Sequence, residues 1–408
     1  MRVAFINSVC GTGSTGKIVT GLLRSVRSAG GDGRIFFGVG EAHDVASGDA
    51  VRYTSSADYY VHNAFSRLTD HAGCYSSGAT RRMIAAIEDY DPDLIHLHNL
   101  HGYYLNTDLL FAYLKDCGRK VVWTLHDCWA FTGHCTHFTS ATCEQWKTGC
   151  EHCVQLRRYP KCLLWGDVRR NFARKKAAFT ALPYLTLVTP SEWLADTVRQ
   201  SFLGKYEVLS IPNGVDTKLF RPTKGNIRSQ LGLRDGDKLA LGVASVWNAR
   251  KGLSDLAALA WLLPEDWRLL IIGVREDQKA SLPESVLTLG RIISQTELAQ
   301  FYSAADVFVN PSYEETMGLT TAEALACGTP AVVYDQTAVP EVVDETSGIV
   351  VPAGDVKALC HAVTTCRLRR EDARARGERY ALARQNNRHL QLYRRLLHDD
   401  SDSTEVLV

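Results

Sequence analysis

The sequence lacks several features that would each define a class of protein. Its most apolar helical stretch, 256–263, has eight residues, whereas a membrane span needs roughly 20. Neither sign of charge is in excess, because 46 Lys and Arg accompany 45 Asp and Glu, and this excludes a globally basic nucleic-acid binder. The opening MRVAFINSVCGTG breaks into glycines after a short apolar run, which is typical of a buried strand and not of a signal peptide. We therefore expect a cytoplasmic protein.

Short apolar runs alternate with helix-length segments along most of the 408 residues, and this length exceeds what one core usually supports. Runs rich in Val and Ile with helices between them indicate parallel sheets covered on both faces. We predict an α/β fold of two Rossmann-like, doubly wound domains, 1–188 and 189–380. The expected strands are 3–9, 34–39, 94–98, 121–125, 186–191, 207–212, 239–245, 269–274, 307–312, 331–335 and 348–352.

The unusual residues follow these strands. In open α/β sheets ligands bind at the carboxyl ends of the strands, so two such edges facing each other would form a central cleft. The residues expected along it are Gly13, Gly16, His98, His126, Asp127, Lys251 and Glu315.

The first of these loops reads GTGSTGKI, 11–18, and seven of its eight positions fit the phosphate-binding loop G-x-x-x-x-G-K-[ST]. Ile18 occupies the position that requires a Mg²⁺-binding hydroxyl. A P-loop-like NTPase is therefore an alternative that lacks its metal ligand. We interpret Gly13 and Gly16 instead as a loop whose backbone comes close to a ligand.

The most specific stretch is NPSYEETMGLTTAEALACGTPAVVYD, 310–335. A strand ends, a loop carries two glutamates, and a helix begins near Gly318. The unpaired N–H groups at such a helix start suit a diphosphate, and Glu315 and Glu323, eight residues apart, can accept hydrogen bonds from sugar hydroxyls. The alternative is a capped surface helix with an acidic first turn.

This stretch resembles the signature of the retaining glycosyltransferases of family 4, which have the GT-B fold. Their usual form is E-x-G-F-G-x-x-x-x-E-A-x-A-x-G-x-P, and here Thr316-Met317 replace the first Gly and the Phe. The resemblance implies that Glu315 contacts the transferred sugar and that Glu323 contacts the ribose. It also implies that the diphosphate binds the backbone of Met317, Gly318 and Leu319. The altered pair is expected to change the wall of the donor pocket.

Other segments resemble the same family. TLHD (124–127) implies that His126 lies beside the reacting sugar, with Asp127 positioning it or capping the next segment. A structural role for His126 is the alternative. ASVWNARKG (244–252) supplies Lys251, which would stabilise the departing diphosphate together with Arg250. Further donor contacts are expected from Asn213, in IPNGVD (211–216), and from Ser245, which could replace the customary Arg. By the same resemblance, the last helix, 381–398, would pack back on the N-terminal domain.

Cysteines concentrate between 128 and 162, where six of the twelve lie. In a reducing compartment they indicate thiols or metal ligands, and a closed zinc site would hold an excursion poor in apolar residues. The alternatives are free thiols or, outside the cytoplasm, disulfides. With VWTLHD before it and WKTGC inside it, the block resembles colanic-acid-type fucosyltransferases and related capsule and exopolysaccharide transferases. The expected structural zinc ligands are Cys135, Cys143, Cys150 and Cys153.

Residues 157–176 carry eight basic side chains and one acid, interleaved with Leu163, Leu164, Trp165 and Phe172. Such a helix could lie on anionic lipid. The alternative is a solvated amphipathic helix packed on the N-terminal domain. We expect no nucleic-acid partner, because the chain has no RNA- or DNA-binding motif.

The resemblance implies transfer of a hexose or deoxyhexose, with retention, from a GDP- or UDP-sugar. The acceptor would be a growing, lipid-linked bacterial surface polysaccharide bound by domain 1–188, with the donor on domain 189–380. No catalytic metal is expected, and no D-x-D motif follows a strand in the N-terminal half. The enzyme would be cytoplasmic, or peripheral on the inner face of the plasma membrane. The alternatives are the P-loop-like NTPase, a non-catalytic zinc- or membrane-binding protein, and a GT-B epimerase or phosphorylase.

Overall fold

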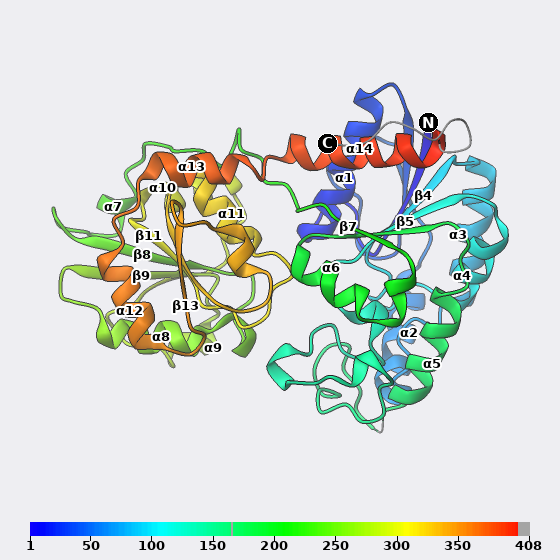
Figure 1. Cartoon of the computed structure of the whole chain (residues 1–408), viewed down its shortest axis with the longest axis horizontal. Coiled ribbons are helices and arrows are strands. Elements are labelled where there is room, and N and C mark those ends of the chain that lie inside the picture. The colour runs from blue at the N-terminus through cyan, green and yellow to red at the C-terminus, as the bar shows by residue number, and fades with distance from the viewer. Residues whose placement is uncertain (165, 399–408) are drawn as a thin grey trace. The chain divides into compact units, whose positions relative to one another are not determined.

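The computed structural model describes residues 1–164 and 166–398, which form two units (Figure 1). The first unit contains Met1–Ile211 and the segment that begins at Gln385, and the second contains Pro212–Arg384. Trp165 of the basic segment lies outside the described residues.

The first unit is built on a seven-stranded parallel sheet of order β3-β2-β1-β4-β5-β6-β7. Its central strands are apolar because helices cover both faces, and five of the six residues of β1 are buried. Its strands are β1 (Arg2–Asn7), β2 (Asp32–Phe37), β3 (Ala50–Arg52), β4 (Leu94–Leu97), β5 (Lys120–Thr124), β6 (Leu185–Thr189) and β7 (Glu207–Ser210).

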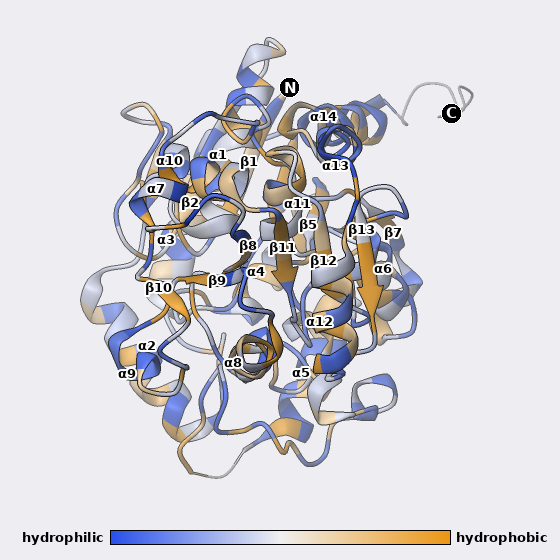
Figure 2. Ribbon diagram, turned by 90° about the vertical axis from the view of Figure 1, so that its left-hand side faces the viewer, coloured by the Kyte–Doolittle hydropathy of each residue, from blue (hydrophilic) through white to orange (hydrophobic). Residues whose placement is uncertain are grey.

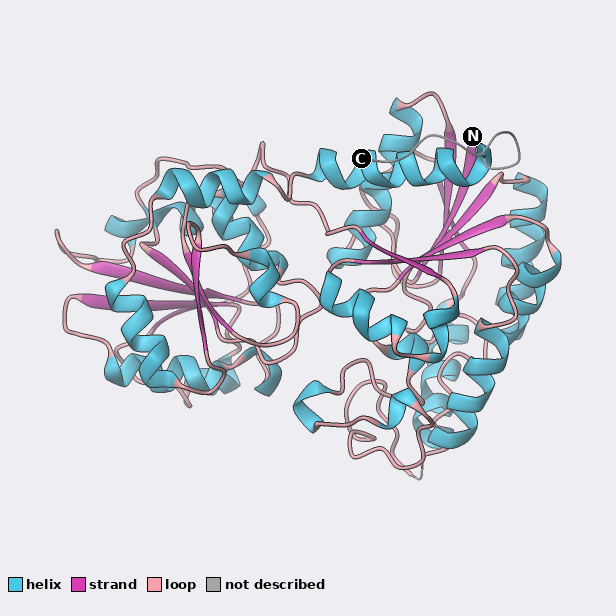
Figure 3. Ribbon diagram, viewed as in Figure 1, coloured by secondary structure: helices cyan, strands magenta, loops and turns pink. Residues whose placement is uncertain are grey.

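Two layers of helices cover this sheet (Figure 3). Helices α1 and α14 share one core with β1, and α3, α4 and α5 share another with the opposite sheet face. The helices are α1 (Gly13–Ser28), α2 (Ser56–Thr69), α3 (Ser77–Tyr90), α4 (Thr107–Asp116), α5 (Val168–Phe179), α6 (Glu192–Arg199) and α14 (Leu382–His398). The 3₁₀ turns are η1 (Trp129–Phe131), η2 (Thr139–Ala141), η3 (Gln145–Lys147) and η4 (Phe202–Lys205).

The second unit has a six-stranded parallel sheet of order β10-β9-β8-β11-β12-β13. Helices α10, α11 and α13 pack on one face, and α8 and α12 pack on the other. Its strands are β8 (Lys238–Val243), β9 (Trp267–Ile272), β10 (Leu287–Leu289), β11 (Val307–Asn310), β12 (Ala331–Tyr334) and β13 (Gly348–Val351). Its helices are α7 (Ile227–Gln230), α8 (Leu253–Leu262), α9 (Glu276–Lys279), α10 (Gln295–Ala304), α11 (Leu319–Ala326), α12 (Val356–Thr365) and α13 (Arg370–Glu378), with 3₁₀ turns η5 (Ala249–Lys251) and η6 (Val339–Val342).

The α/β class and the two doubly wound sheets are confirmed, and each of the eleven expected strands is present. Two strands were not expected, β3 and β10. Each has only three residues, too few to show a period in the sequence.

The expected boundary at 188/189 was wrong, because the first unit continues to Ile211. The intervening residues complete β6 and form α6 and β7, and β7 pairs in parallel with β6, with Thr186 opposite Glu207. The packing expected of the last helix is confirmed: from Gln385 onward α14 belongs to the first unit, and Tyr393 is fully buried there.

No helix among the described residues combines the length and the apolar character needed to cross a membrane.

Candidate active site

In the second unit, two loops after neighbouring strands are fastened together. Asn248 accepts a hydrogen bond from the Arg250 amide (3.0 Å) and starts η5. Gly252 follows with φ +71°, and a Cβ there would lie 2.2 Å from the Pro311 carbonyl oxygen, so only glycine fits. The Tyr313 amide donates to the Arg250 carbonyl (2.8 Å). The loop after β8 therefore lies directly against the loop after β11.

This contact brings the predicted charged residues together. Lys251 Nζ forms an ion pair with Glu315, and Arg250 Nε lies 3.8 Å from an oxygen of the buried Glu314. The Glu315 amide donates to Thr337 Oγ1 (3.0 Å). Two cations and two carboxylates thus gather at the carboxyl edge of the sheet, where ligands bind in this class of fold.

Helix α11 begins at the same edge. Gly318, with φ +92°, precedes its first residue and supplies no side-chain cap. No side-chain cap therefore occupies the first-turn N–H groups of α11, which lie at the positive end of the helix dipole. Glu323 accepts a hydrogen bond from Tyr302 Oη (2.9 Å). The Met317 side chain is buried in the core of the second unit.

Two predicted donor residues lie outside this group of contacts. Ser245 is exposed in the loop after β8, and Asn213 is half-buried at the start of the second unit. Their roles stay predictions.

Asp255 is a supporting residue that the sequence analysis missed. It is buried, and its Oδ2 accepts hydrogen bonds from Tyr313 Oη and Tyr334 Oη, both at 2.7 Å. Burial, followed by the hydrogen bond to Asp255, raises the pKa of Tyr313 to about 12. The available signal was an acid in the helix 253–262, whose other residues are apolar except for Ser254.

In the first unit, Gly11 and Gly16 of the loop 11–16 occupy closely packed positions. A Cβ on Gly11 would lie 2.0 Å from the His43 carbonyl oxygen, and one on Gly16 would lie 3.0 Å from the Gly11 amide nitrogen. Gly13 starts α1 with φ +63°. Ile18 is buried in the core of the unit. The resemblance to a nucleotide-triphosphate loop is therefore superficial, because the metal-ligand position is a core position.

A row of imidazoles lies at the carboxyl end of β4, where His96 and His98 are buried and His126 is half-buried. His98 Nδ1 is 3.1 Å from His126 Nε2, and the two rings stack at 5.4 Å. His96 lies 2.6 Å from Tyr393 Oη and 2.8 Å from Thr124 Oγ1. The predicted residues His98 and His126 are thus in direct contact.

Burial keeps these imidazoles neutral. It lowers the pKa of His126 to about 4, although the charge of Asp127 acts in the opposite direction. The pKa of His98 is lowered well below its ordinary value by burial and then by His96 and His126. His98 Nε2 has no hydrogen-bond partner within the described chain. Since a buried N–H without a partner is rarer than a buried acceptor without one, His98 carries its proton on Nδ1 and donates to His126 Nε2. A neutral His126 then carries its own proton on Nδ1.

Asp127 contacts a different histidine from the one expected. His101 Nε2 lies 2.7 Å from Asp127 Oδ2, and His101 Nδ1 lies 2.9 Å from Tyr159 Oη. The Trp129 amide, at the first residue of η1, donates to Asp127 Oδ1 (2.9 Å), whereas the N-cap of this turn is Cys128. Burial raises the pKa of Asp127, but the charge and hydrogen bond of His101 outweigh it and lower that pKa to about 2.

The cysteine-rich excursion is held by aromatic rings. Phe138 and Trp146 stack at 4.8 Å, and Phe131 lies edge-on to Trp146 at 5.6 Å. The twelve cysteines are free thiols. A hydrogen bond from Cys135 lowers the pKa of Cys153 to about 6.

No three His, Cys, Asp or Glu side chains within 1–164 and 166–398 are grouped to hold a metal ion. The structure therefore does not assemble Cys135, Cys143, Cys150 and Cys153 into the expected tetrahedral site. Zinc binding itself stays a prediction.

The basic segment packs on the first unit. Helix α5 buries Phe172 and Lys175, and Lys175 Nζ donates to the carbonyls of Trp129 (2.8 Å) and Thr132 (3.0 Å). Leu163 and Leu164, before the helix, are exposed.

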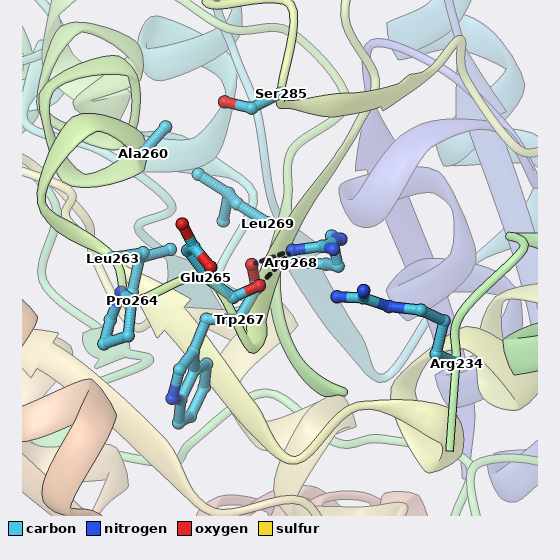
Figure 4. Close-up of a pocket in the computed structure, with 9 residues that line it drawn as sticks. All are labelled: Arg234, Ala260, Leu263, Pro264, Glu265, Trp267, Arg268, Leu269 and Ser285. Carbon is cyan, nitrogen blue, oxygen red and sulfur yellow. Dashed lines mark hydrogen bonds between the residues drawn. The ribbon is translucent and has the colours of Figure 1, made fainter. Parts of the chain in front are cut away.

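A hollow in the second unit lies at the opposite strand ends (Figure 4). Trp267 and Arg268 in its wall pair with the first residues of β8, whereas Lys251 follows the last residue of that strand. This hollow is therefore separate from the candidate site. It is lined by Arg234, Ala260, Leu263, Pro264, Glu265, Trp267, Arg268, Leu269 and Ser285.

Comparisons with known proteins agree with this geometry. Residues 38–219 match the family model "Glycosyltransferase Family 4", and residues 237–367 match "Glycosyl transferases group 1". The chain is 27% identical over 277 residues to the putative colanic acid biosynthesis glycosyl transferase WcaC of Escherichia coli K12, covering 66% of each chain. It is 33% identical over 241 residues to a GDP-mannose-dependent α-(1-6)-phosphatidylinositol dimannoside mannosyltransferase of Mycobacterium tuberculosis, covering 55% of this chain and 61% of that one. The chain thus matches less than two thirds of the length of either relative.

Solved structures share the whole architecture. Sucrose-phosphate synthase from Thermosynechococcus elongatus superimposes with a TM-score of 0.72 at 21% identity, covering 98% of this chain and 99% of that one. Anabaena HepE, solved with UDP and glucose, gives a TM-score of 0.66 at 14% identity, covering 97% and 99%. At such identities the likeness concerns the fold. The two family models match consecutive parts of the chain and both describe glycosyltransferases, so the chain resembles glycosyltransferases of family 4, and the solved structures show that it has the GT-B fold.

Proposed function

We propose that the protein transfers a hexose or deoxyhexose, with retention, from a GDP- or UDP-sugar to a growing, lipid-linked surface polysaccharide, without a catalytic metal. The observation that carries the proposal is the group formed by Lys251, Glu315 and the start of α11 at one sheet edge. The names of the relatives support the substrate class, since one is assigned to colanic acid biosynthesis and another is GDP-mannose-dependent.

The donor would bind the second unit. Its diphosphate would accept hydrogen bonds from the first-turn N–H groups of α11 and would replace Glu315 as the partner of Lys251. Glu315, released from the ion pair, would accept hydrogen bonds from the sugar, and Glu323 from the ribose. Arg250 would add a second positive charge against the leaving group.

In the reaction, the acceptor hydroxyl oxygen bonds to the anomeric carbon while the bond from that carbon to the diphosphate breaks. The diphosphate oxygen takes the hydroxyl proton, so the products are a glycoside and a nucleoside diphosphate. Lys251 and Arg250 stabilise the charge that develops on the leaving group, and this kind of stabilisation is usually a large part of catalysis. His126, with its proton on Nδ1, would donate a hydrogen bond to a sugar hydroxyl. The first unit would bind the acceptor at the cytoplasmic side of the membrane.

The test is a panel of GDP- and UDP-sugars with purified protein, in which released nucleoside diphosphate is measured with and without a lipid-linked oligosaccharide. We expect release from one donor, stimulated by acceptor and reduced roughly 100-fold or more by Glu315→Gln. The matched control is Glu345→Gln, an exposed acid of the same unit. Absence of turnover with every donor, or a Glu315→Gln variant as active as the wild type, would overturn the proposal.

A further inference from the structure

Helix α2 of the first unit is amphipathic, but its polar side faces the protein interior and its apolar side faces solvent. Its buried side is polar, with His62 and Ser66 facing inward. His62 Nδ1 lies 2.8 Å from Ser76 Oγ, and its Nε2 accepts a hydrogen bond from the Gly73 amide (3.3 Å), so the inner side is held by polar contacts. The outer side therefore carries the apolar residues of the helix, where most surface helices carry polar ones.

These outer residues form one stripe, which we call the α2 face. The four large side chains are Tyr60, Val61, Phe65 and Leu68, exposed by 68%, 54%, 50% and 44%. Ala57 and Ala64, also exposed, complete the spacing i, i+3, i+4, i+7, i+8, i+11 of one helix face. An exposed apolar stripe of this kind is typical of a surface that binds a protein or a membrane.

A second segment extends the stripe. The Leu163 amide donates to the carbonyl of Arg67 (2.7 Å), which attaches the loop before α5 to the last turn of α2. Leu163 and Leu164 are exposed there. Asn171 Nδ2 also donates to the Asp70 carbonyl (2.6 Å), so the start of α5 lies against the end of α2. Figure 1 shows where α2 lies in the first unit, and Figure 2 colours its ribbon by hydropathy.

The surroundings of the α2 face are basic. Residues 157–170 contain five Lys or Arg and one acid, and these five, like Arg67, are exposed. The acid, Asp167, pairs with His71 (2.8 Å), and Asp58 of α2 lies 3.5 Å from Arg82. The positive charges around the stripe are therefore in excess. They are Arg67, Arg157, Arg158, Lys161, Arg169 and Arg170.

We propose that the α2 face docks the protein on an anionic lipid bilayer. Its apolar side chains would enter the boundary between headgroups and acyl chains while the surrounding Arg and Lys contact lipid phosphates. The charge pattern selects this occupant over a second copy of the chain, because two basic rims would repel each other. The sequence analysis predicted lipid contact from the helix in 157–176. The structure shows instead that α5 buries its own apolar residues, whereas α2 exposes the apolar residues that it carries. The inference adds to the proposed lipid-linked acceptor and does not rest on it, because vesicle binding requires no nucleotide sugar.

The test is co-sedimentation of the full chain with vesicles of phosphatidylcholine plus phosphatidylglycerol, and with phosphatidylcholine alone. We expect binding to the anionic vesicles that weakens with salt. The double variant Val61→Ser, Phe65→Ser should bind at least roughly 10-fold more weakly than the wild type, since membrane affinity scales with the apolar area that enters the bilayer. The matched control is Trp261→Ser, which removes an apolar side chain exposed by 77% from the second unit. Circular dichroism and nucleotide binding would check that each variant is folded.

A charge variant provides an independent arm. Arg169→Gln with Arg170→Gln should reduce binding to anionic vesicles by roughly 10-fold. The proposal would be overturned if the wild type does not bind anionic vesicles, or if the double α2 variant binds them as strongly as the wild type. Elution of the wild type as a dimer that Val61→Ser, Phe65→Ser converts to a monomer would assign the face to a second copy and would also overturn it.

Discussion

His98 and His126 illustrate how a neighbouring residue can decide which proton a functional side chain presents. Their shared hydrogen bond (3.1 Å) and the unpartnered Nε2 of His98 place the proton of His126 on Nδ1. In the proposed reaction His98 would act as a positioning residue, since it touches His126 and needs no contact with the sugar.

Replacing His98 should change the tautomer of His126. In His98→Leu the donor to Nε2 is lost, so we expect the two tautomers to mix and kcat to fall about 10-fold, the value of one hydrogen bond. His98→Asn, whose amide can still donate, should retain most of the activity. Nitrogen-15 NMR of the His126 ring is the direct measurement.

The tautomer readout separates positioning from a merely structural effect, because loss of packing alone would lower Tm without changing the ring nitrogens of a folded protein. An unchanged His126 spectrum in folded His98→Leu would contradict the assignment.

The residue types at the site could be predicted from sequence, but several partners could not. Lys251 and Glu315 follow strands that a parallel sheet places side by side, so their meeting follows from the topology. His101 is different, because its contact with Asp127 depends on a loop whose path no periodic pattern specifies. Asp255 was missed for a similar reason, since only the folded core brings two tyrosine hydroxyls to it.

At the scale of elements, the excursion between β5 and α5 contains only 3₁₀ turns and loops, yet it has its own aromatic cluster. Trp146 is buried between Phe131 and Phe138. Stacked and edge-on rings of this kind stabilise a segment that lacks regular hydrogen bonding. The sequence analysis assigned that role to zinc because cysteines are more conspicuous in a sequence than three separated aromatics.

Trp146→Ala should lower the free energy of unfolding of the first unit by about 3–5 kcal/mol, the range for a buried Trp or Phe truncation. Thermal unfolding monitored by calorimetry would measure it. Trp261→Ala is the control, because an exposed side chain is expected to change stability by about 0.5 kcal/mol or less.

Adding a chelator to the wild type distinguishes the two ways of holding the excursion. If the aromatic cluster suffices, EDTA leaves Tm unchanged. If Cys135, Cys143, Cys150 and Cys153 bind structural zinc as the sequence predicts, the purified protein contains the metal and its removal lowers Tm.

At the scale of the whole molecule, the two units differ in their content of buried histidine. The second unit has one histidine, the exposed His361. In the first unit, burial lowers the pKa of five imidazoles, to about 4 for His126 and His389. The five are His62, His96, His98, His126 and His389.

This difference predicts that acid unfolds the first unit before the second. A histidine whose pKa is lowered in the folded state binds its proton only on unfolding. Its contribution to the free energy of unfolding is therefore fully present above about pH 6.5, the pKa of histidine in the unfolded state. It is lost as the pH falls from about 6.5 to about 4, because there the unfolded state binds more protons. Calorimetry between pH 7 and pH 5 should therefore show one transition moving to lower temperature more steeply than the other. Two transitions that shift in parallel would contradict the prediction.

The division of the chain shows where sequence reasoning was limited at this scale. The alternation of strands and helices fixed two doubly wound sheets, but it could not tell which sheet the strand at 207–210 joins. That choice depends on the parallel pairing of β7 with β6 and on the burial of Val208 in the first unit. Both are contacts between residues that lie far apart in the sequence, and local sequence patterns do not predict such contacts.

The central claim is that Lys251 and its neighbours bind the diphosphate of a nucleotide sugar. Calorimetric titration of UDP and GDP into the wild type, Lys251→Met and the exposed Lys218→Met tests it most directly. We predict that the wild type binds one of the two nucleotides, that Lys251→Met binds it about 10–100-fold more weakly because a charged hydrogen bond is lost, and that Lys218→Met is unchanged. Equal affinity in the wild type and Lys251→Met, or no binding of either nucleotide to the folded wild type, would contradict the account.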